Sequence, residues 1–505
     1  MYLHTKFNAR NMVGQYLPGT LNVLTIVVKT LKIVFSRSFL FGRCKSEEET
    51  MLEKFFKLKE HGTTVSTEVL AGFTTFFTMA YILFVNPSML AETGLTQNGV
   101  YIATILSAVV GTTIMSLFAN LPYAQAAGMG LNAFFTYTVV FKLGYTPYEA
   151  LAMVFVCGVF NILITITRIR VHLIAAIPET LKQAIGAGIG LFIAYIGFLN
   201  VGFFDFGSGV PAIVDNFLTN PGTLLFLIGL VITVILMLTN VKGAILIGII
   251  ATTIIGIPMG LVDLTQLSGM GATSYGQVFK DFAGTFGKAL SAEGIVSLFK
   301  NHNLFQVFSI VFAFSMADTF DTIGTFIGTG RRSGIFTQED EEKMLSGTGL
   351  STRLDRGLFA DSIASSIGAV LGTSNVTTFV ESSAGIEAGG RTGLTSLTVS
   401  GLFLLSIVAA PVIGLVPTQA TAPALVIVGV LMSSAFADIE WTNLRNAIPA
   451  FFTVIMTVLS YSISNGLAFG FFIYLVVEIA LGNWKKIHPI MYVSTLLFLL
   501  SFILN

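Results

Sequence analysis

Apolar runs of about twenty residues recur along this chain, and this recurrence limits its fold more than any other feature. A helix needs roughly twenty consecutive apolar residues to cross the hydrocarbon core of a bilayer. Twelve such runs are expected to cross as helices: 67–89, 98–118, 148–167, 178–199, 221–239, 243–260, 304–324, 358–372, 393–412, 423–437, 447–462 and 465–481. The sequence therefore predicts an all-α integral membrane protein.

The composition agrees with this class and excludes several others. Of the 505 residues, 54% are hydrophobic and only 11% are charged, whereas a soluble protein carries about 25% charged residues. The net charge is zero, which argues against a nucleic-acid partner. Cys44 and Cys157 are far apart and the five histidines are scattered singly. We therefore expect no disulfide framework, no metal site, no organic cofactor and no enzyme activity.

Two further regions are shorter than the apolar runs and richer in Gly, Ser, Thr and Asn. They cover 121–141 and 373–391, and each combines an extended segment with a short helix. Counted with the twelve runs they are the third and tenth of fourteen spans, which predicts two inverted seven-span repeats, as in many transporters. Non-helical backbone at membrane depth is tolerated only inside protein or beside a cavity. The two broken spans therefore locate a substrate site.

The expected eighth span carries two acids that a simple lipid-facing helix would not contain. Asp318 and Asp321 are three residues apart, so they share one side of the helix with Ser315, Thr322 and Thr325. A charged group near the bilayer centre costs roughly 2.5–3.5 kcal/mol on insertion scales, so intramembrane acids usually have a function. We expect this polar stripe to line a substrate and proton site in a transporter.

Further candidates lie at the short helices of the broken spans. Glu381 is expected both to cap a helix start, where an acid is stabilising, and to contact the ligand. Asn132 takes the corresponding place in the first half. Asp361 is expected to hold backbone or loop groups. The alternative for Asp318 is a structural ion pair, but the only basic residue well inside a predicted span is Lys182, near its cytoplasmic end.

Charge in the loops predicts the topology, because short cytoplasmic loops carry the excess of Lys and Arg. With the N-terminus inside, fourteen spans leave four lysines outside: Lys142, Lys280, Lys288 and Lys300. The cytoplasmic side then carries twelve basic residues: Arg168, Arg170, Lys242, Arg331, Arg332, Lys343, Arg353, Arg356, Arg391, Arg445, Lys485 and Lys486. The predicted repeats are residues 51–260 and 304–481, joined by an extracellular loop at 261–303.

The two ends of the chain are expected to lie outside the repeats. Residues 1–50 are basic, and two interpretations stay open: an amphipathic surface segment, or an extension that is not native, with Met51 as the functional start. Residues 482–505 form an apolar tail. Its run 487–504 either lies on the membrane surface or crosses the bilayer.

Three motifs together resemble one family of permeases. They read AGMGLNAFF at 127–135, ADTFDTIGT at 317–325 and TSNVTTFVESSAGI at 373–386. In this order they are similar to the AzgA-like purine permeases, which belong to the nucleobase/ascorbate transporter superfamily. The likeness extends from about Met51 to the C-terminus.

The resemblance implies both an architecture and an activity. The implied fold has a core domain of spans 1–4 and 8–11 and a gate domain of spans 5–7 and 12–14. The implied activity is uptake of hypoxanthine, guanine or adenine across the plasma membrane, with H⁺ as the coupling ion. Asp318, Glu381 and Asn132 would hold the base, and Asp321 matches a second acid of the family. Asp318 is the expected proton carrier, with Asp321 as its competitor.

Some alternatives stay open at this point. An adenine-preferring permease of the same family is one, and an anion transporter of the same inverted-repeat fold is another. The three acids and the lack of a cation near the predicted site argue against anion transport. The expected partners are a purine nucleobase and the lipid bilayer, and a homodimer is the assembly to be tested.

Overall fold

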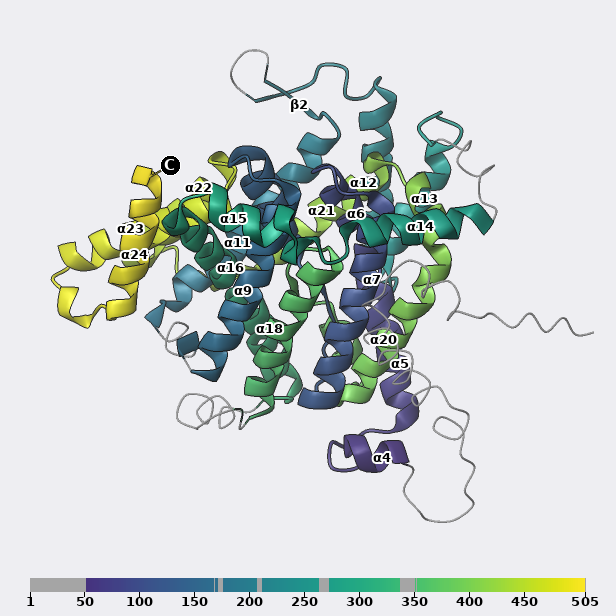
Figure 1. The fold of residues 1–505 in the computed structure, drawn as a ribbon, viewed down its shortest axis with the longest axis horizontal. Coiled ribbons are helices and arrows are strands. Elements are labelled where there is room, and N and C mark those ends of the chain that lie inside the picture. Colours follow the sequence, from purple (N-terminus) through teal and green to yellow (C-terminus); the bar gives the residue numbers. More distant parts are fainter. Residues whose placement is uncertain are drawn as a thin grey trace, which may run out of the picture.

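The structure is a computed structural model and describes residues 51–167, 169–170, 176–206, 211–262, 272–336, 350 and 352–504. The two interpretations of residues 1–50 lie outside the described residues. The described chain is mostly helical, and its helices run close together in a single bundle (Figure 1).

The first half of the described chain contains three short strands among its helices. The elements are α4 (Met51–Phe56), α5 (Val65–Met79), α6 (Ile82–Ala91), α7 (Gln97–Ile114), η1 (Met115–Ala119), β1 (Gln125–Ala127), α8 (Met129–Ala133), η2 (Phe134–Lys142), α9 (Pro147–Ile166), α11 (Glu179–Asn200), β2 (Phe204–Asp205), β3 (Ala212–Ile213), α12 (Pro221–Leu238) and α13 (Ala244–Gly256).

The second half repeats the pattern of long helices around one short strand. The elements are α14 (Ala272–Thr285), η4 (Lys288–Leu290), η5 (Ala292–Val296), α15 (Ser297–Asn301), α16 (Leu304–Ser333), α18 (Arg353–Leu371), β4 (Val376–Thr378), α19 (Ser382–Glu387), α20 (Gly393–Leu405), η6 (Ser406–Leu415), α21 (Thr418–Met432), η7 (Ser433–Asp438), α22 (Leu444–Leu459), α23 (Ile463–Ala480), η8 (Trp484–Lys486) and α24 (Pro489–Leu504).

Nine helices among the described residues are long and apolar enough to cross a membrane. They lie within Val65–Ala91, Gln97–Ala119, Pro147–Ile166, Glu179–Asn200, Pro221–Leu238, Leu304–Phe326, Gly393–Pro411, Thr418–Asp438 and Ile463–Ala480. Each agrees with one of the apolar runs, so the prediction of a helical, multi-pass membrane protein is confirmed. Three shorter apolar helices follow the same pattern: Ala244–Gly256, Leu444–Leu459 and Pro489–Leu499.

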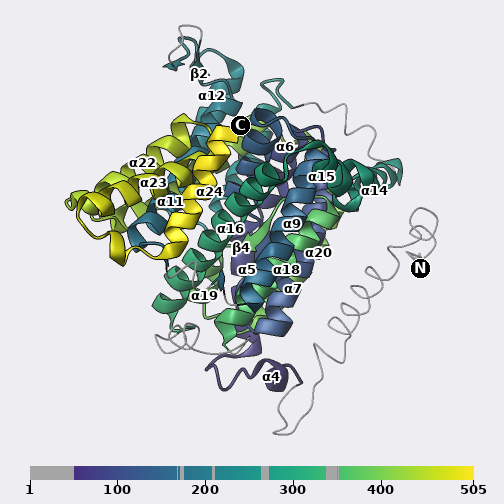
Figure 2. The same ribbon diagram turned by 60° about the vertical axis from the view of Figure 1, so that its left-hand side comes forward.

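Strands β1 and β4 pair with each other in the middle of the bundle, although they are far apart in sequence. The pairing is antiparallel, and Gln125, Ala126 and Ala127 face Thr378, Thr377 and Val376. All six residues are buried. Each strand leads into a short helix, β1 into α8 and β4 into α19. Figure 2 shows β4 next to α16, and α19 lies below both of them in this view.

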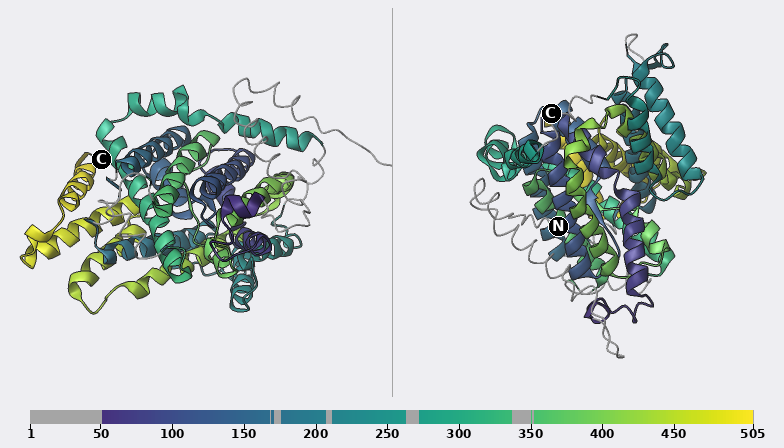
Figure 3. Two further views of the ribbon diagram at one scale, coloured as in Figure 1. Left: turned by 90° about the horizontal axis from the view of Figure 1, so that it is seen from below. Right: turned by 90° about the vertical axis from the view of Figure 1, so that its right-hand side faces the viewer.

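The helices pack in two groups. One group consists of α5, α7, α9, α16, α18, α19 and α20, and the other consists of α11, α12, α13, α21, α22 and α23. In Figure 1, α22 and α23 lie at the edge of the molecule away from α5, α7 and α20. Helices α14 and α15 lie across the ends of α7 and α9, along one side of the bundle (Figure 3).

The two groups touch at the C-terminal end of α11. Asn200, the last residue of α11, donates through Nδ2 to Glu92 Oε1 at 3.2 Å and to the Tyr137 hydroxyl at 3.0 Å. Tyr137 in turn donates to both carboxylate oxygens of Glu92 at 3.1 Å. Nearby, Lys142 donates to the carbonyl of Ser460 at 2.6 Å. These contacts join Glu92, just after α6, and the π-helix η2 to the end of α11 and to the turn between α22 and α23.

Several element boundaries differ from the expected ones, for local reasons. The first span is divided at Ala80 and Tyr81. There the backbone makes turn-type hydrogen bonds between residues three apart, such as that from Leu83 N–H to the Ala80 carbonyl. Helix α18 starts at Arg353 rather than near residue 358, because Thr352 and Asp355 form a capping box. The apolar tail forms α24, which packs on α16 and α23.

Candidate functional site

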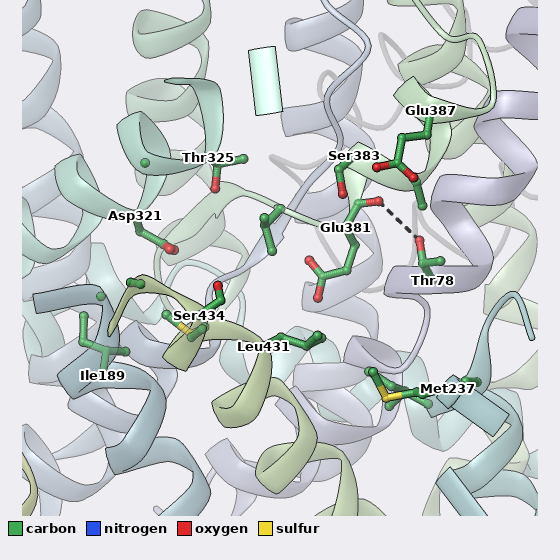
Figure 4. A pocket seen from close by; sticks show the side chains of 18 of the residues that line it. Thr78, Ile189, Met237, Asp321, Thr325, Glu381, Ser383, Glu387, Leu431 and Ser434 are labelled. Atoms are coloured by element: carbon green, nitrogen blue, oxygen red, sulfur yellow. Dashed lines mark hydrogen bonds between the residues drawn. The ribbon is translucent and has the colours of Figure 1, made fainter. Parts of the chain in front are cut away.

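A large cavity lies between the two groups of helices. Its volume is about 960 Å³, and residues from α5, α11, α16, α19 and α21 contribute to its wall. A second cavity of about 740 Å³ shares part of this wall, including Gln183, Gly324, Ser383 and Ser434. We refer to the first cavity as the central cavity. Figure 4 shows Asp321 and Glu381 projecting into it from different elements.

Asp321 reaches the central cavity from the middle of α16. Its carboxylate is half-buried, and Oδ2 accepts a hydrogen bond from the Thr377 hydroxyl of β4 at 3.2 Å. The neighbouring strand residue Thr378 points to the opposite face, as successive strand residues do, and donates to Asp361 of α18 at 3.0 Å. Strand β4 therefore contacts two acids on two different helices.

Glu381 reaches the cavity from the start of α19. The Tyr81 hydroxyl donates to Glu381 Oε1 at 2.6 Å, and the Thr78 hydroxyl donates to the Glu381 carbonyl at 3.4 Å. Glu381 occupies the position before the first helical residue, but its side chain makes no capping hydrogen bond. The expectation that this carboxylate also caps the helix is therefore wrong, because the carboxylate is held by Tyr81 instead.

The carboxylates of Asp321 and Glu381 thus each have one oxygen that accepts a hydrogen bond from a hydroxyl group. For Asp321 Oδ1 and Glu381 Oε2 we find no hydrogen bond to any other described residue, and the Glu381 carboxylate also interacts with its own backbone N–H. Both side chains are only half-buried, so these two oxygens can accept from water or from a ligand in the cavity. The arrangement can therefore bind N–H donors.

Asp318, three residues before Asp321, lies behind the cavity wall. It is fully buried, and Oδ2 accepts from Asn161 Nδ2 of α9 at 2.7 Å. Asn161 in turn accepts through Oδ1 from the Ser315 hydroxyl. Asp318 Oδ1 has no hydrogen-bond partner among the described residues. Asp318 does not contribute to the wall of the central cavity, and its predicted contact with substrate stays a prediction.

Asn132 is also fully buried and lies outside the cavity wall. Its Oδ1 accepts from the Ser374 hydroxyl, just before β4. The backbone N–H of Gly128, one turn earlier, donates to the Asn375 carbonyl at 2.9 Å. Asn132 therefore helps to join the start of α8 to the segment that leads into β4.

A buried arginine that the sequence did not reveal lies close to these acids. Arg170 was expected in a cytoplasmic loop, but its side chain is fully buried against α18. Its Nη1 donates to the Leu358 carbonyl at 3.1 Å and to the Ser362 hydroxyl at 2.9 Å, and its Nη2 is 3.7 Å from Asp361 Oδ2. Asp361 therefore has an ionic partner in addition to the hydroxyl groups of Thr322 and Thr378.

Two lysines line the central cavity, so the expectation that no cation lies near the site is wrong. Lys182 is one-fifth exposed and is 3.0 Å from Glu179. Lys242 donates to the Thr74 hydroxyl at 3.3 Å. Among the described residues no group of three or more His, Cys, Asp or Glu side chains could hold a metal ion.

The arrangement of the helices is similar to that of solved membrane transporters. The transmembrane domain of a cyanobacterium bicarbonate transporter, BicA, gives a TM-score of 0.58 at 15% identity, over 79% of this chain and 97% of that chain. SLC26A9 gives a TM-score of 0.57 at 11% identity, over 95% and 72%. At these identities the likeness is one of fold alone. It shows a multi-pass membrane fold with inverted repeats.

Sequence relatives narrow this class to a family. The adenine permease AdeP of Escherichia coli (strain K12) is 40% identical over 456 residues, which are 90% of this chain and 96% of that protein. The guanine/hypoxanthine permease PbuO of Bacillus subtilis (strain 168) is 39% identical over 451 residues, which are 88% and 99%. The profile of the Permease family matches residues 66–469. The chain belongs to the Permease family, which confirms the resemblance drawn from its three motifs.

Proposed function

We propose that this protein takes up purine nucleobases together with protons across the plasma membrane, with hypoxanthine and guanine as the preferred substrates. The relatives that support this proposal are named as guanine/hypoxanthine permeases and as adenine permeases. Adenine is therefore the alternative substrate. The observation that carries the proposal is that the carboxylates of Asp321 and Glu381 lie in one cavity, and that each has one oxygen hydrogen-bonded to a hydroxyl group.

The chemistry of a neutral purine fits this pair. Hypoxanthine and guanine present N–H donors on both rings, and adenine presents a ring N–H and an amino group. A carboxylate oxygen accepts from each of these donors. A site that is built to hydrogen-bond its ligand rejects analogues that lack the donor far more strongly than an apolar pocket does.

The proposed architecture has fourteen spans in two inverted repeats, with the third and tenth spans broken. The antiparallel pairing of β1 and β4, each followed by a short helix, supports the two broken spans. The separate packing of the two groups of helices supports a division into a core domain of spans 1–4 and 8–11 and a gate domain of spans 5–7 and 12–14.

The proposed orientation places the N-terminus in the cytoplasm. Lys182 and Lys242 line the central cavity, and both lie near predicted cytoplasmic ends of spans. In this orientation the cavity opens to the cytoplasm, while the contacts of Glu92, Tyr137 and Asn200 close the extracellular end. The conformation described here is therefore proposed to be inward-open.

We propose that Asp318 carries the coupled proton, with Asp321 as the competing carrier. Asp318 is buried, and one of its oxygens has no hydrogen-bond partner among the described residues. A buried carboxyl group of this kind is costly when it is charged. We propose that Asp318 and Asn132 complete the substrate site from behind the cavity wall, and that the protein forms a homodimer.

The test is uptake of radiolabelled hypoxanthine in cells that lack their own purine permeases. Unlabelled guanine and adenine are expected to compete, whereas uracil is not, and a protonophore is expected to abolish accumulation against a gradient. Glu381→Gln is expected to abolish uptake without loss of the protein from the membrane. Wild-type protein that reaches the membrane but accumulates no purine would contradict the proposal.

Anion transport is a second candidate, because Lys182 and Lys242 line the same cavity. The BicA fold, whose representative is a bicarbonate transporter, is compatible with it. Uptake of labelled bicarbonate by the same cells distinguishes the two functions. We expect no uptake of bicarbonate above that of cells without the protein, because Asp321, Glu381 and Glu387 make the cavity wall more acidic than basic.

A further inference from the structure

The two cavity carboxylates are each held by one hydroxyl group from another element. Tyr81, in the break between α5 and α6, donates to Glu381 Oε1 at 2.6 Å. Thr377, in the middle of β4, donates to Asp321 Oδ2 at 3.2 Å. The two contacts have the same form: one oxygen of the carboxylate is held by a hydroxyl group and the other is left for the cavity.

The hydroxyl groups cannot easily change partners. Tyr81 and Thr377 are each only 1% exposed, whereas the carboxylates that they hold are half-buried. If either carboxylate turned away, a buried hydroxyl group would lose its hydrogen bond, and a buried polar group without a partner is costly. The direction of each free oxygen is therefore set by a residue that does not itself line the cavity.

We propose that Tyr81 and Thr377 are positioning residues that aim the free oxygens of Glu381 and Asp321 at opposite edges of one planar ligand. This inference rests on the proposed function, in which these two carboxylates bind the substrate. It also narrows the class of substrate: the ligand must carry an N–H donor on each of two opposite edges. Hypoxanthine and guanine meet this requirement because each carries an N–H in both rings, and hypoxanthine that is methylated at the N–H of one ring does not.

The two variants that remove the hydroxyl groups with little change in shape are Tyr81→Phe and Thr377→Val. Each is expected to raise the KM for hypoxanthine uptake by about tenfold, because hydrogen bonds to charged groups are among the stronger ones. Vmax is expected to change by less than about twofold. Thr377→Ser keeps the hydroxyl group and is expected to restore the wild-type KM.

The matched control for Tyr81 is another buried tyrosine that donates one hydrogen bond. Tyr101 is 1% exposed and donates to the Ser406 carbonyl at 2.6 Å, away from the central cavity. Tyr101→Phe is expected to leave the KM within about twofold of the wild-type value. If Tyr81→Phe changes the KM no more than Tyr101→Phe does, Tyr81 is not a positioning residue.

Competition by two methylated analogues separates positioning from a general structural effect. Wild-type protein is expected to bind 1-methylhypoxanthine and 9-methylhypoxanthine at least about tenfold more weakly than hypoxanthine. Tyr81→Phe is expected to lose discrimination against one of the two analogues, and Thr377→Val against the other. If both variants weaken all three ligands by the same factor, the proposal is wrong.

The failure of this inference can be told apart from the failure of the proposed function. Purine uptake by the wild-type protein, abolished by Glu381→Gln, supports the function whatever the hydroxyl variants do. If the wild-type protein takes up purine and discriminates against neither methylated analogue, the ligand does not need an N–H donor on each of two opposite edges. The proposed function then stands while this inference is wrong. If the wild-type protein takes up no purine at all, both proposals fail.

Discussion

Asp318 and Asp321 lie on the same helix three residues apart, yet their surroundings differ. Asp321 is half-buried and lines the central cavity, whereas Asp318 is fully buried and is held by Asn161. The difference arises because the two residues are nearly one helical turn apart and meet different neighbours, β4 at one position and α9 at the other. Two acids of one motif can therefore have separate roles.

We predict that Asp318→Asn separates binding from accumulation. Asn keeps the shape and can still accept a hydrogen bond from Asn161, so the protein is expected to fold and to keep measurable binding of hypoxanthine, weakened because Asp318 is proposed to contribute to the substrate site. It can no longer carry a proton, and uptake against a gradient is expected to fall to background. Binding is measured by thermal stabilisation of the purified protein, and accumulation by radiolabelled uptake. Normal accumulation would remove Asp318 from the coupling mechanism.

The second prediction about single residues concerns the buried ion pair between Arg170 and Asp361. Breaking a buried ion pair from one side costs about 3–5 kcal/mol, because it leaves an uncompensated charge, whereas replacing both partners can be neutral. Arg170→Gln alone is therefore expected to reduce the amount of folded protein strongly. The double variant Arg170→Gln with Asp361→Asn is expected to recover most of it.

The measurement for this pair is fluorescence-detected size-exclusion chromatography in detergent, with the melting temperature as a second readout. Asp361→Asn alone serves as the control for loss of the acid. A double variant that is no more stable than Arg170→Gln would show that the pair does not act as a unit.

How far these residues could be predicted depended on what surrounds each of them in sequence. Asp321 and Glu381 could be found, because an acid in an apolar or broken span is rare. Tyr81 could not, because nothing near it in sequence indicates that its hydroxyl group meets a residue 300 positions away. Arg170 was misplaced because a basic residue close to the end of an apolar run is usually a loop residue.

At the scale of elements, the short helix α19 depends on close contact with α5. A Cβ added at Gly385 of α19 would lie 2.0 Å from Thr75 Oγ1 and 2.6 Å from the Ala71 carbonyl, both on α5. The backbone atoms cannot give way without moving one helix from the other. Since Glu381 directly precedes α19 and Tyr81 follows α5, this contact also fixes the distance between those two residues.

We predict that Gly385→Ala lowers the stability of the protein by about 1–3 kcal/mol, as is usual when extra volume is forced into a packed contact. Hypoxanthine uptake is expected to fall with it. The control is Gly276→Ala on α14, where an added Cβ meets no atom within 4 Å. Melting temperatures of the purified variants test the prediction, and equal values for Gly385→Ala and the wild type would contradict it.

The long helices were the part of the fold that the sequence predicted best, because twenty apolar residues in a row have few other uses. Their ends were predicted less well. The start of α18 depends on the capping box of Thr352 and Asp355, and the division between α5 and α6 depends on local hydrogen bonds. Neither feature changes the average polarity of the run that contains it.

For the whole molecule, a cluster of hydrogen bonds joins the two groups of helices at one end, and the central cavity lies between them towards the other, where Lys242 still donates to Thr74. Glu92, Tyr137 and Asn200 make the joined end. In the proposed inward-open state these hydrogen bonds close the extracellular side. They must break whenever the cavity opens to that side, so they contribute to the balance between the two states.

We predict that Tyr137→Phe shifts this balance away from the inward-open state. The loss of a hydrogen bond worth about 1 kcal/mol changes an equilibrium about fivefold. A cysteine introduced by Ser434→Cys, in the wall of the cavity, is then expected to react more slowly with a membrane-impermeant thiol reagent in inside-out vesicles. The rate is compared with that of the same reporter in the Tyr101→Phe background.

The native cysteines set the background of this measurement. Cys157 is fully buried, and labelling of protein without the added cysteine is subtracted. A rate that is unchanged by Tyr137→Phe would mean that the contact does not bias the two states.

The pairing of β1 with β4 also has a consequence for biosynthesis. About 250 residues separate the two strands, so at roughly 5–20 residues per second the first strand waits for tens of seconds before its partner is synthesised. During that time its N–H and C=O groups lack their final partners inside or beside the lipid, where such groups are costly. The newly made first half must therefore be sheltered, by water or by the insertion machinery, until the ribosome has synthesised β4.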